Sequence, residues 1–151
     1  MNSEWTQEDL YLIASRAYDL YLEGRLEDAA EIFEGLLAID KGDPYCLEAL
    51  AAISLALNRP EDAVHYATVL LADWPAHRDA LARRCEAHIQ LNMRDEAERD
   101  LQTLTQLRAF AHQRRLQLRL QVWDGQISSA TNRLLQGAKD ATSELTSPIT
   151  V

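Results

Sequence analysis

The chain has 151 residues, of which 47% are hydrophobic, and its formal net charge is −9. This length and apolar content are enough for one domain with a buried core. The acidic balance argues against nucleic acid as a partner, because phosphate binding draws on clustered Lys and Arg. The chain also lacks a run of roughly 18 uncharged apolar residues and, at its start, a basic segment followed by an apolar one. We therefore expect a cytoplasmic protein without membrane insertion.

Helix-forming residues fill most of the chain, and only five glycines and four prolines interrupt it. This composition predicts an all-α fold. Thr6, followed three residues later by Asp9, is a cap signal for the first helix. In chain order, helices are expected at 7–22, 26–39, 45–57, 61–72, 78–91, 94–107, 110–123 and 126–139.

Two sets of residues recur with a period of 34. They are the alanines Ala29, Ala63 and Ala97, and the turn residues before them, Gly24, Asn58 and Asn92. A 34-residue period built from two helices resembles the tetratricopeptide repeat. In such a repeat both helices carry a small residue where they cross closely. Here those residues are Ala17, Ala51 and Cys85 in the first helices and the three alanines in the second helices.

The resemblance implies a right-handed solenoid of three helix pairs, at about 10–43, 44–77 and 78–110. A degenerate capping pair is expected at 111–140, because the spacing of the first turn recurs there: Gly125 precedes Ala130 by five residues, as Gly24 precedes Ala29. Residues 116–122 alternate as a strand would, but a lone strand would have no sheet to join, so helix is favoured. Together these elements form one domain, 1–141, followed by a disordered tail, 142–151.

The first helices of such a stack line its concave surface, where a polypeptide partner binds. Three tyrosines, Tyr11, Tyr18 and Tyr21, share one helical face. This spacing fits either residues that line the groove or residues that pack between helices, and both interpretations stay open. Projection of the repeat predicts the groove residues Tyr11, Ala14, Tyr18, Tyr21, Leu22, Tyr45, Glu48, Ala52, Leu55, Ala82, Arg83, Glu86, Ile89 and Gln90.

Charge is distributed unevenly along the chain. Residues 1–75 carry four basic and fifteen acidic side chains, a balance of −11, whereas residues 76–151 carry eleven basic and nine acidic ones, a balance of +2. The acidic half is either a solvated surface that maintains solubility or a surface that attracts a basic partner segment. The later basic face, with Arg108, Arg114, Arg115 and Arg119, fits a solvated surface or contact with the acidic half better than RNA or acidic lipid.

The cysteines, histidines and glycines of the sequence do not form a pattern typical of a catalytic or metal site. Cys46 and Cys85 lack CxxC spacing and are expected to be reduced structural thiols. The histidines, His65, His77, His88 and His112, lack metal-ligand spacing, and there is no glycine-rich phosphate loop. We expect no enzyme activity, no catalytic residues, no metal and no cofactor.

A more specific resemblance extends from Glu8 to Ala52 and weakly into the third repeat. The residues that carry it are Leu10-Tyr11, Ala17-Tyr18, Tyr21, Gly24, Leu26-Glu27-Asp28-Ala29, Phe33, Leu36, the Asp40 to Asp43 loop, Leu47, Leu50, Ala52, Cys85 and Leu91-Asn92. In these the chain resembles the tetratricopeptide chaperones of bacterial type III secretion systems, the class that holds translocators.

The resemblance implies a function in the bacterial cytoplasm. The groove would hold an extended segment of a client before export, either a translocator or a needle component, with Tyr18 and Tyr21 in contact. A general tetratricopeptide adaptor in another bacterial assembly is the alternative. Either way the partner is a protein rather than nucleic acid or a membrane, and both a monomer and a homodimer stay open.

Overall fold

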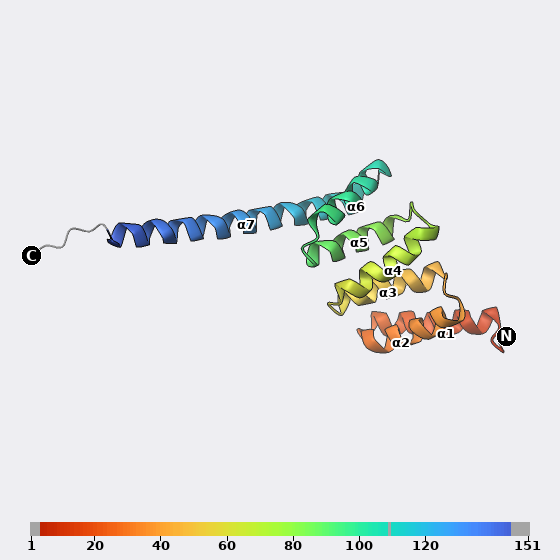
Figure 1. The fold of residues 1–151 in the computed structure, drawn as a ribbon. Helices are drawn as coiled ribbons and strands as arrows, with labels where there is room; N and C mark the ends of the chain where they lie inside the picture. Colours follow the sequence, from red (N-terminus) through yellow and green to blue (C-terminus); the bar gives the residue numbers. More distant parts are fainter. Residues whose placement is uncertain (1–3, 109, 146–151) are drawn as a thin grey trace, which may run out of the picture. The chain divides into compact units, whose positions relative to one another are not determined.

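The computed structural model describes residues 4–108 and 110–145. Within those residues every regular element is a helix, which confirms the predicted all-α class (Figure 1). The first six predicted helices agree with the structure to within one residue at each end. The helices are α1 (Gln7–Leu22), α2 (Leu26–Ile39), α3 (Pro44–Ala56), α4 (Pro60–Asp73), α5 (Arg78–Gln90), α6 (Arg94–Gln106) and α7 (Phe110–Leu145).

Helices α1 to α6 form three antiparallel pairs, and each helix packs against the next one along the chain. Helix α3 also packs against α5, so the first helices of the second and third repeats touch directly. The six small residues predicted at the helix crossings are all fully buried: Ala17, Ala29, Ala51, Ala63, Cys85 and Ala97. Small side chains let the helix axes approach closely, so this burial confirms the register of the three repeats.

The turns inside the three pairs share one backbone conformation. Gly24, Asn58 and Asn92 have φ angles of 79°, 59° and 58°, which lie in the left-handed region. Glycine adopts this region without steric cost, and asparagine enters it more readily than most other residues. The 34-residue recurrence of Gly or Asn therefore follows from a turn that must reverse the chain between two closely packed helices.

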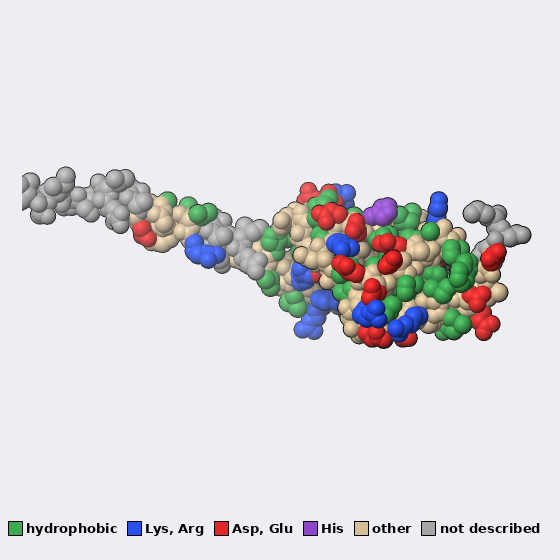
Figure 2. Space-filling view, turned by 90° about the horizontal axis from the view of Figure 1, so that it is seen from below, with side chains coloured by type: hydrophobic (Ala, Val, Ile, Leu, Met, Phe, Trp, Pro, Cys, Tyr) green, Lys and Arg blue, Asp and Glu red, His purple; other side chains and the backbone are tan. Residues whose placement is uncertain are grey.

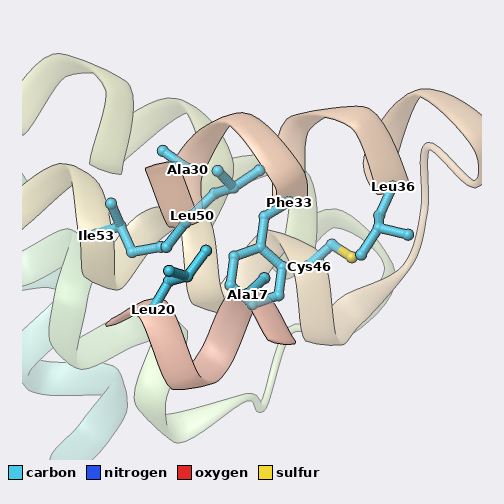
Figure 3. Close-up of a cluster of buried hydrophobic side chains, with 9 residues drawn as sticks. Ala17, Leu20, Ala30, Phe33, Leu36, Cys46, Leu50 and Ile53 are labelled. Carbon is cyan, nitrogen blue, oxygen red and sulfur yellow. The ribbon is translucent and has the colours of Figure 1, made fainter. Parts of the chain in front are cut away.

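The core of the first two repeats is apolar and is built around Phe33. Its ring lies beside Ala17 of α1 and Cys46 of α3, and Leu50 and Ile53 extend the same cluster along α3 (Figure 3). All five side chains are at most 1% exposed. Burial of apolar surface at about 25 cal/mol per Å² is the main force that holds these helices together. Through Phe33 of α2, this core joins α1 to α3, the two helices that carry most of the predicted groove.

The C-terminal region differs from the expected capping pair. The structure has one helix, α7, where two helices with a break near Gly125 were expected. Gly125 does not adopt the positive φ of Gly24, and a single glycine inside a helix costs only about 1 kcal/mol relative to alanine. Residues 142–145 of the predicted tail are the last turn of α7, and residues 146–151 lie outside the described part of the chain.

By its internal contacts the chain divides into two units, Met1–Leu116 and Gln117–Val151. The three repeats lie in the first unit, and the second contains most of α7. None of the helices in the described ranges is long and apolar enough to cross a bilayer.

Candidate functional site

Two adjoining cavities lie on the side of the stack formed by the first helices. We call the smaller one, of about 280 Å³, the tyrosine pocket; it is lined by Tyr18, Tyr21, Phe33, Tyr45, Glu48, Ala49, Ala52, Ile53 and Arg83. We call the larger one, of about 900 Å³, the N-terminal cleft; it is lined by Trp5, Gln7, Leu10, Tyr11, Ala14, Ser15, Tyr18, Asp19, Leu36, Ile39, Asp40, Asp43 and Tyr45. Tyr18 and Tyr45 line both cavities, which therefore adjoin at these two side chains; we call the two cavities together the groove.

The tyrosine pocket has aromatic walls whose positions are set by the apolar core. The rings of Tyr18 and Tyr21 stack with their centroids 6.1 Å apart, and Tyr45 meets the buried ring of Phe33 edge-on at 5.9 Å. Tyr18 and Tyr45 are each 46% exposed, whereas Tyr21 packs partly against the core. Burial, and to a lesser extent the neighbouring Tyr18 and Cys46, raises the pKa of Tyr45. Its phenol is therefore a neutral hydrogen-bonding group at neutral pH.

Two groups of opposite charge border the tyrosine pocket. Glu48 of α3 lies 3.6 Å from Nε2 of His77, measured from its Oε2. Nδ1 of His77 accepts a hydrogen bond from the backbone N–H of Ala80, which assigns the proton to Nε2, on the side of Glu48. Across the pocket, Nε of Arg83 is buried and has no hydrogen-bond partner among the described residues. Because that nitrogen is shielded from solvent, it is an unsatisfied structural donor, and the outer nitrogens of the guanidinium are the ones that a ligand in the pocket would contact.

The N-terminal cleft combines exposed aromatic rings with carboxylates. Tyr11 is 71% exposed and Trp5 is 56% exposed. Asp40 and Asp43 come from the loop between α2 and α3, and Asp19 comes from α1. Figure 2, which views the stack from its α1–α2 end, shows apolar side chains at the surface beside acidic ones. The cleft is therefore an acidic aromatic surface and not a purely apolar one.

The structure brings together eight of the predicted groove residues in these cavities and leaves others out. The eight are Tyr11, Ala14, Tyr18, Tyr21, Tyr45, Glu48, Ala52 and Arg83. Leu22, at 65% exposure, and Leu55, Glu86 and Gln90 line neither cavity. Ala82 and Ile89 are buried, at 1% and 8% exposure, so the structure corrects their placement on the groove surface. The reason is that α5 packs against α3, α4 and α6, which cover more of it than the projection assumed.

One buried polar cluster in the third repeat was not predicted. Asp100 of α6 is 4% exposed and accepts two hydrogen bonds from Arg84 of α5, at 2.7 and 3.0 Å. Nδ1 of His88 lies 3.2 Å from Oδ2 of Asp100, but it is not oriented for a well-formed hydrogen bond, so we treat the contact as electrostatic. The sequence contains a signal for this pair. The residues 34 positions before Arg84 and Asp100 are Leu50 and Tyr66, which are not charged. Charged residues at positions that are apolar or aromatic in another repeat indicate a buried pair.

This cluster and the two thiols are structural in character. Burial acts to raise the pKa of Asp100, but the contacts with His88 and Arg84 outweigh it, and the pKa lies below the ordinary value of 3.8. Burial, together with Asp43, raises the pKa of the Cys46 thiol to about 12. Cys85 is buried and donates to the carbonyl oxygen of Ala97 at 3.2 Å. Neither cysteine forms a disulfide within the described ranges, and no group of three potential metal ligands occurs there.

No family model matches the chain. Its sequence is similar to a DnaJ homolog subfamily C member 7 homolog from Schizosaccharomyces pombe, with 33% identity over 105 residues, which are 67% of this chain and 22% of the relative. The chain therefore spans less than a quarter of that relative's length.

Solved structures resemble the chain over most of its length. The first TPR of Spaghetti (RPAP3), bound to the HSP90 peptide SRMEEVD, has a TM-score of 0.71 at 16% identity and covers 82% of this chain and 99% of its own. The chain has the tetratricopeptide-repeat fold. PcrH of Pseudomonas aeruginosa, in complex with the chaperone binding region of PopB, has a TM-score of 0.71 at 21% identity, with coverages of 78% and 99%. The type III secretion translocator chaperone SycD of Yersinia enterocolitica has a TM-score of 0.67 at 21% identity, with coverages of 77% and 97%.

Proposed function

We propose that this chain is a protein-binding chaperone that holds an extended segment of a type III secretion client, a translocator or needle component, in its groove before export. The observation that carries the proposal is the tyrosine pocket, where three tyrosine rings and Arg83 converge. The rings offer apolar contact at low entropic cost, and their hydroxyls offer hydrogen bonds. In this proposal the chain acts in the bacterial cytoplasm.

The size and chemistry of the pocket suit a peptide side chain. A cavity of about 280 Å³ accommodates an apolar anchor residue but not a whole folded domain. Arg83 also lines the pocket, and its guanidinium can donate to a carbonyl oxygen of the bound backbone. This pairing of an apolar anchor with a backbone hydrogen bond is how grooves recognise extended segments. The likeness to PcrH, whose complex contains a chaperone binding region, supports the same interpretation.

A general tetratricopeptide adaptor is the second candidate. It is favoured by the similarity to the DnaJ homolog subfamily C member 7 homolog and by the fold likeness to Spaghetti bound to an HSP90 peptide. That peptide, SRMEEVD, carries three acidic residues and one arginine. The groove presents Asp19, Asp40, Asp43 and Glu48 against a single Arg83, a charge balance that opposes an acidic ligand.

Co-expression with a type III secretion translocator tests the proposal. We expect the translocator to become soluble and to copurify with the chain. Tyr18→Ala should weaken the isolated complex at least about tenfold, because it removes a ring shared by both cavities. Leu22→Ala is the matched control: it lies on the same helix, is more exposed, and lines neither cavity.

Circular dichroism should first show that both variants keep the helical fold. A translocator that stays insoluble beside the wild-type chain would contradict the secretion role. In that case, tight binding of labelled SRMEEVD would favour the adaptor. Equal effects of Tyr18→Ala and Leu22→Ala on binding would contradict the groove.

A further inference from the structure

The N-terminal cleft continues the groove beyond the tyrosine pocket, and its chemistry differs from that of the pocket. Its lining residues include three carboxylates and, in the described part of the chain, no Lys, Arg or His. The tyrosine pocket, by contrast, holds Glu48 and Arg83 together. A segment that passes from one cavity to the other through Tyr18 and Tyr45 therefore meets an environment of a single charge sign in the cleft.

The carboxylates of the cleft are not neutralised by neighbouring cations. Asp43 accepts hydrogen bonds from the backbone N–H of Tyr45 and from Sγ of Cys46, and Asp40 accepts one from the backbone N–H of Gly42. These donors are uncharged, so both carboxylates keep their negative charge exposed to a ligand. The carboxylate of Asp19 is exposed on α1 and forms no ion pair with any described residue.

Aromatic rings stand beside these carboxylates. The exposed rings of Trp5, Tyr11 and Tyr18 line the same cleft. A Lys or Arg side chain can lay its apolar stem along such rings and place its cation over a ring face, while a carboxylate binds the charged head. Trp and Tyr faces attract cations in this way, and the net charge of −11 over residues 1–75 adds long-range attraction of the same sign.

We infer that the N-terminal cleft binds a Lys or Arg side chain of the client segment, and that this residue flanks the apolar anchor in the tyrosine pocket. The inference rests on the proposed function, which it deepens by defining the ligand's charge. It predicts that the ligand of the groove is a basic, extended peptide. Asp19 is exposed and, unlike Asp40 and Asp43, its side chain accepts no hydrogen bond from a described residue, so it is the residue to change.

The test uses fluorescently labelled extended decapeptides with the full chain. All share an apolar core of Ala, Val and Leu and differ only at one flanking position, which is Lys, Arg, Gln or Glu. Binding is measured by fluorescence anisotropy at low and at raised salt. We expect the Lys and Arg peptides to bind at least about tenfold more tightly than the Glu peptide, with a smaller ratio at raised salt because the cleft is open to solvent.

Charge reversal locates the effect. Asp19→Lys should abolish or invert the preference for the Lys peptide over the Glu peptide. Glu31→Lys makes the same charge change at an exposed position of α2 that lines neither cavity, and it should leave most of the preference in place. Circular dichroism spectra of both variants should match that of the wild-type chain.

The outcomes separate this inference from the proposed function. Binding of the Lys and Glu peptides with equal Kd, still weakened by Tyr18→Ala, would overturn the basic-residue site and leave the peptide groove intact. Equal effects of Asp19→Lys and Glu31→Lys would also overturn the site. They would mean that the overall charge of the chain, and not the cleft, causes the preference for the Lys peptide over the Glu peptide. Failure of every peptide to bind would overturn both.

Discussion

The cores of the second and third repeats occupy equivalent positions but are stabilised by different interactions. Leu50, which is 1% exposed, packs in the apolar cluster around Phe33. Thirty-four residues later, Arg84 binds Asp100 through two hydrogen bonds, and Asp100 stands where the second repeat has Tyr66. The same helix-pair geometry therefore accommodates either an apolar contact or a buried ion pair.

The comparison shows where the chain concentrates each kind of interaction. The apolar core supports α1 and α3, whose tyrosines line the groove. The third repeat adds charge pairing to its apolar contacts, and Arg84 also reaches Thr68 of α4 at 3.4 Å. An apolar contact weakens gradually as atoms are removed, whereas a buried pair leaves an uncompensated charge when one partner is lost.

Truncation of Asp100 should produce the largest effect on stability. Asp100→Ala leaves Arg84 and His88 facing each other without the carboxylate between them. We expect a loss of about 3 kcal/mol in the free energy of unfolding, at the low end of the range for a broken buried pair because the Arg84 side chain is 23% exposed. Urea unfolding followed by circular dichroism measures it.

The control lies on the same helix. Glu98→Ala removes an exposed carboxylate of α6 that pairs with Arg94 at 2.8 Å, and it should change the stability by less than about 0.5 kcal/mol. The double variant Arg84→Leu, Asp100→Leu replaces the ion pair of the third repeat with two apolar side chains and should recover most of the loss. If Asp100→Ala is as mild as Glu98→Ala, the two cores do not differ in the way proposed.

Acid should have a smaller effect of the same origin. Because folding lowers the pKa of Asp100 below 3.8, its carboxylate stabilises the native state above that pH, and this stabilisation is lost as the pH falls through the lowered value. Protonation keeps a hydrogen-bonding carboxyl group in place, so the loss should be smaller than after truncation. Urea midpoints measured from pH 5 to pH 2 should fall more for the wild-type chain than for the Arg84→Leu, Asp100→Leu variant. Parallel curves would show that Asp100 does not contribute.

The repeat region could be predicted from the sequence because its constraints are local and periodic. A residue in a left-handed turn and a small residue at a helix crossing are each required by backbone geometry, and both recur every 34 residues. Gly24 and Ala29 therefore identify Asn58 and Ala63 without any knowledge of the tertiary structure. The register did not decide whether Tyr18 is exposed, because the same spacing also fits packing between helices; the structure shows it 46% exposed.

The remaining features depend on contacts that the period does not determine. Ala82 and Ile89 were expected on the groove, but their burial depends on how many helices cover α5. Gly125 repeats the spacing of Gly24, yet it lies inside α7, because a glycine permits a turn without requiring one. The unpartnered Nε of Arg83 depends on which acceptors come near it in three dimensions.

A substitution at Gly24 should have the smallest effect and shows how much the turn itself contributes. Gly24→Ala places a Cβ where no atom lies within 4 Å, so packing is not disturbed and only the backbone conformation at φ 79° is penalised. We expect a loss of about 1 kcal/mol in the free energy of unfolding. Gly42→Ala, in the loop before α3 and with an ordinary φ, is the matched control and should have little effect. If Gly24→Ala is equally silent, the recurrence of Gly and Asn at this turn reflects something other than backbone conformation, and the third repeat's Asn92 loses the same explanation.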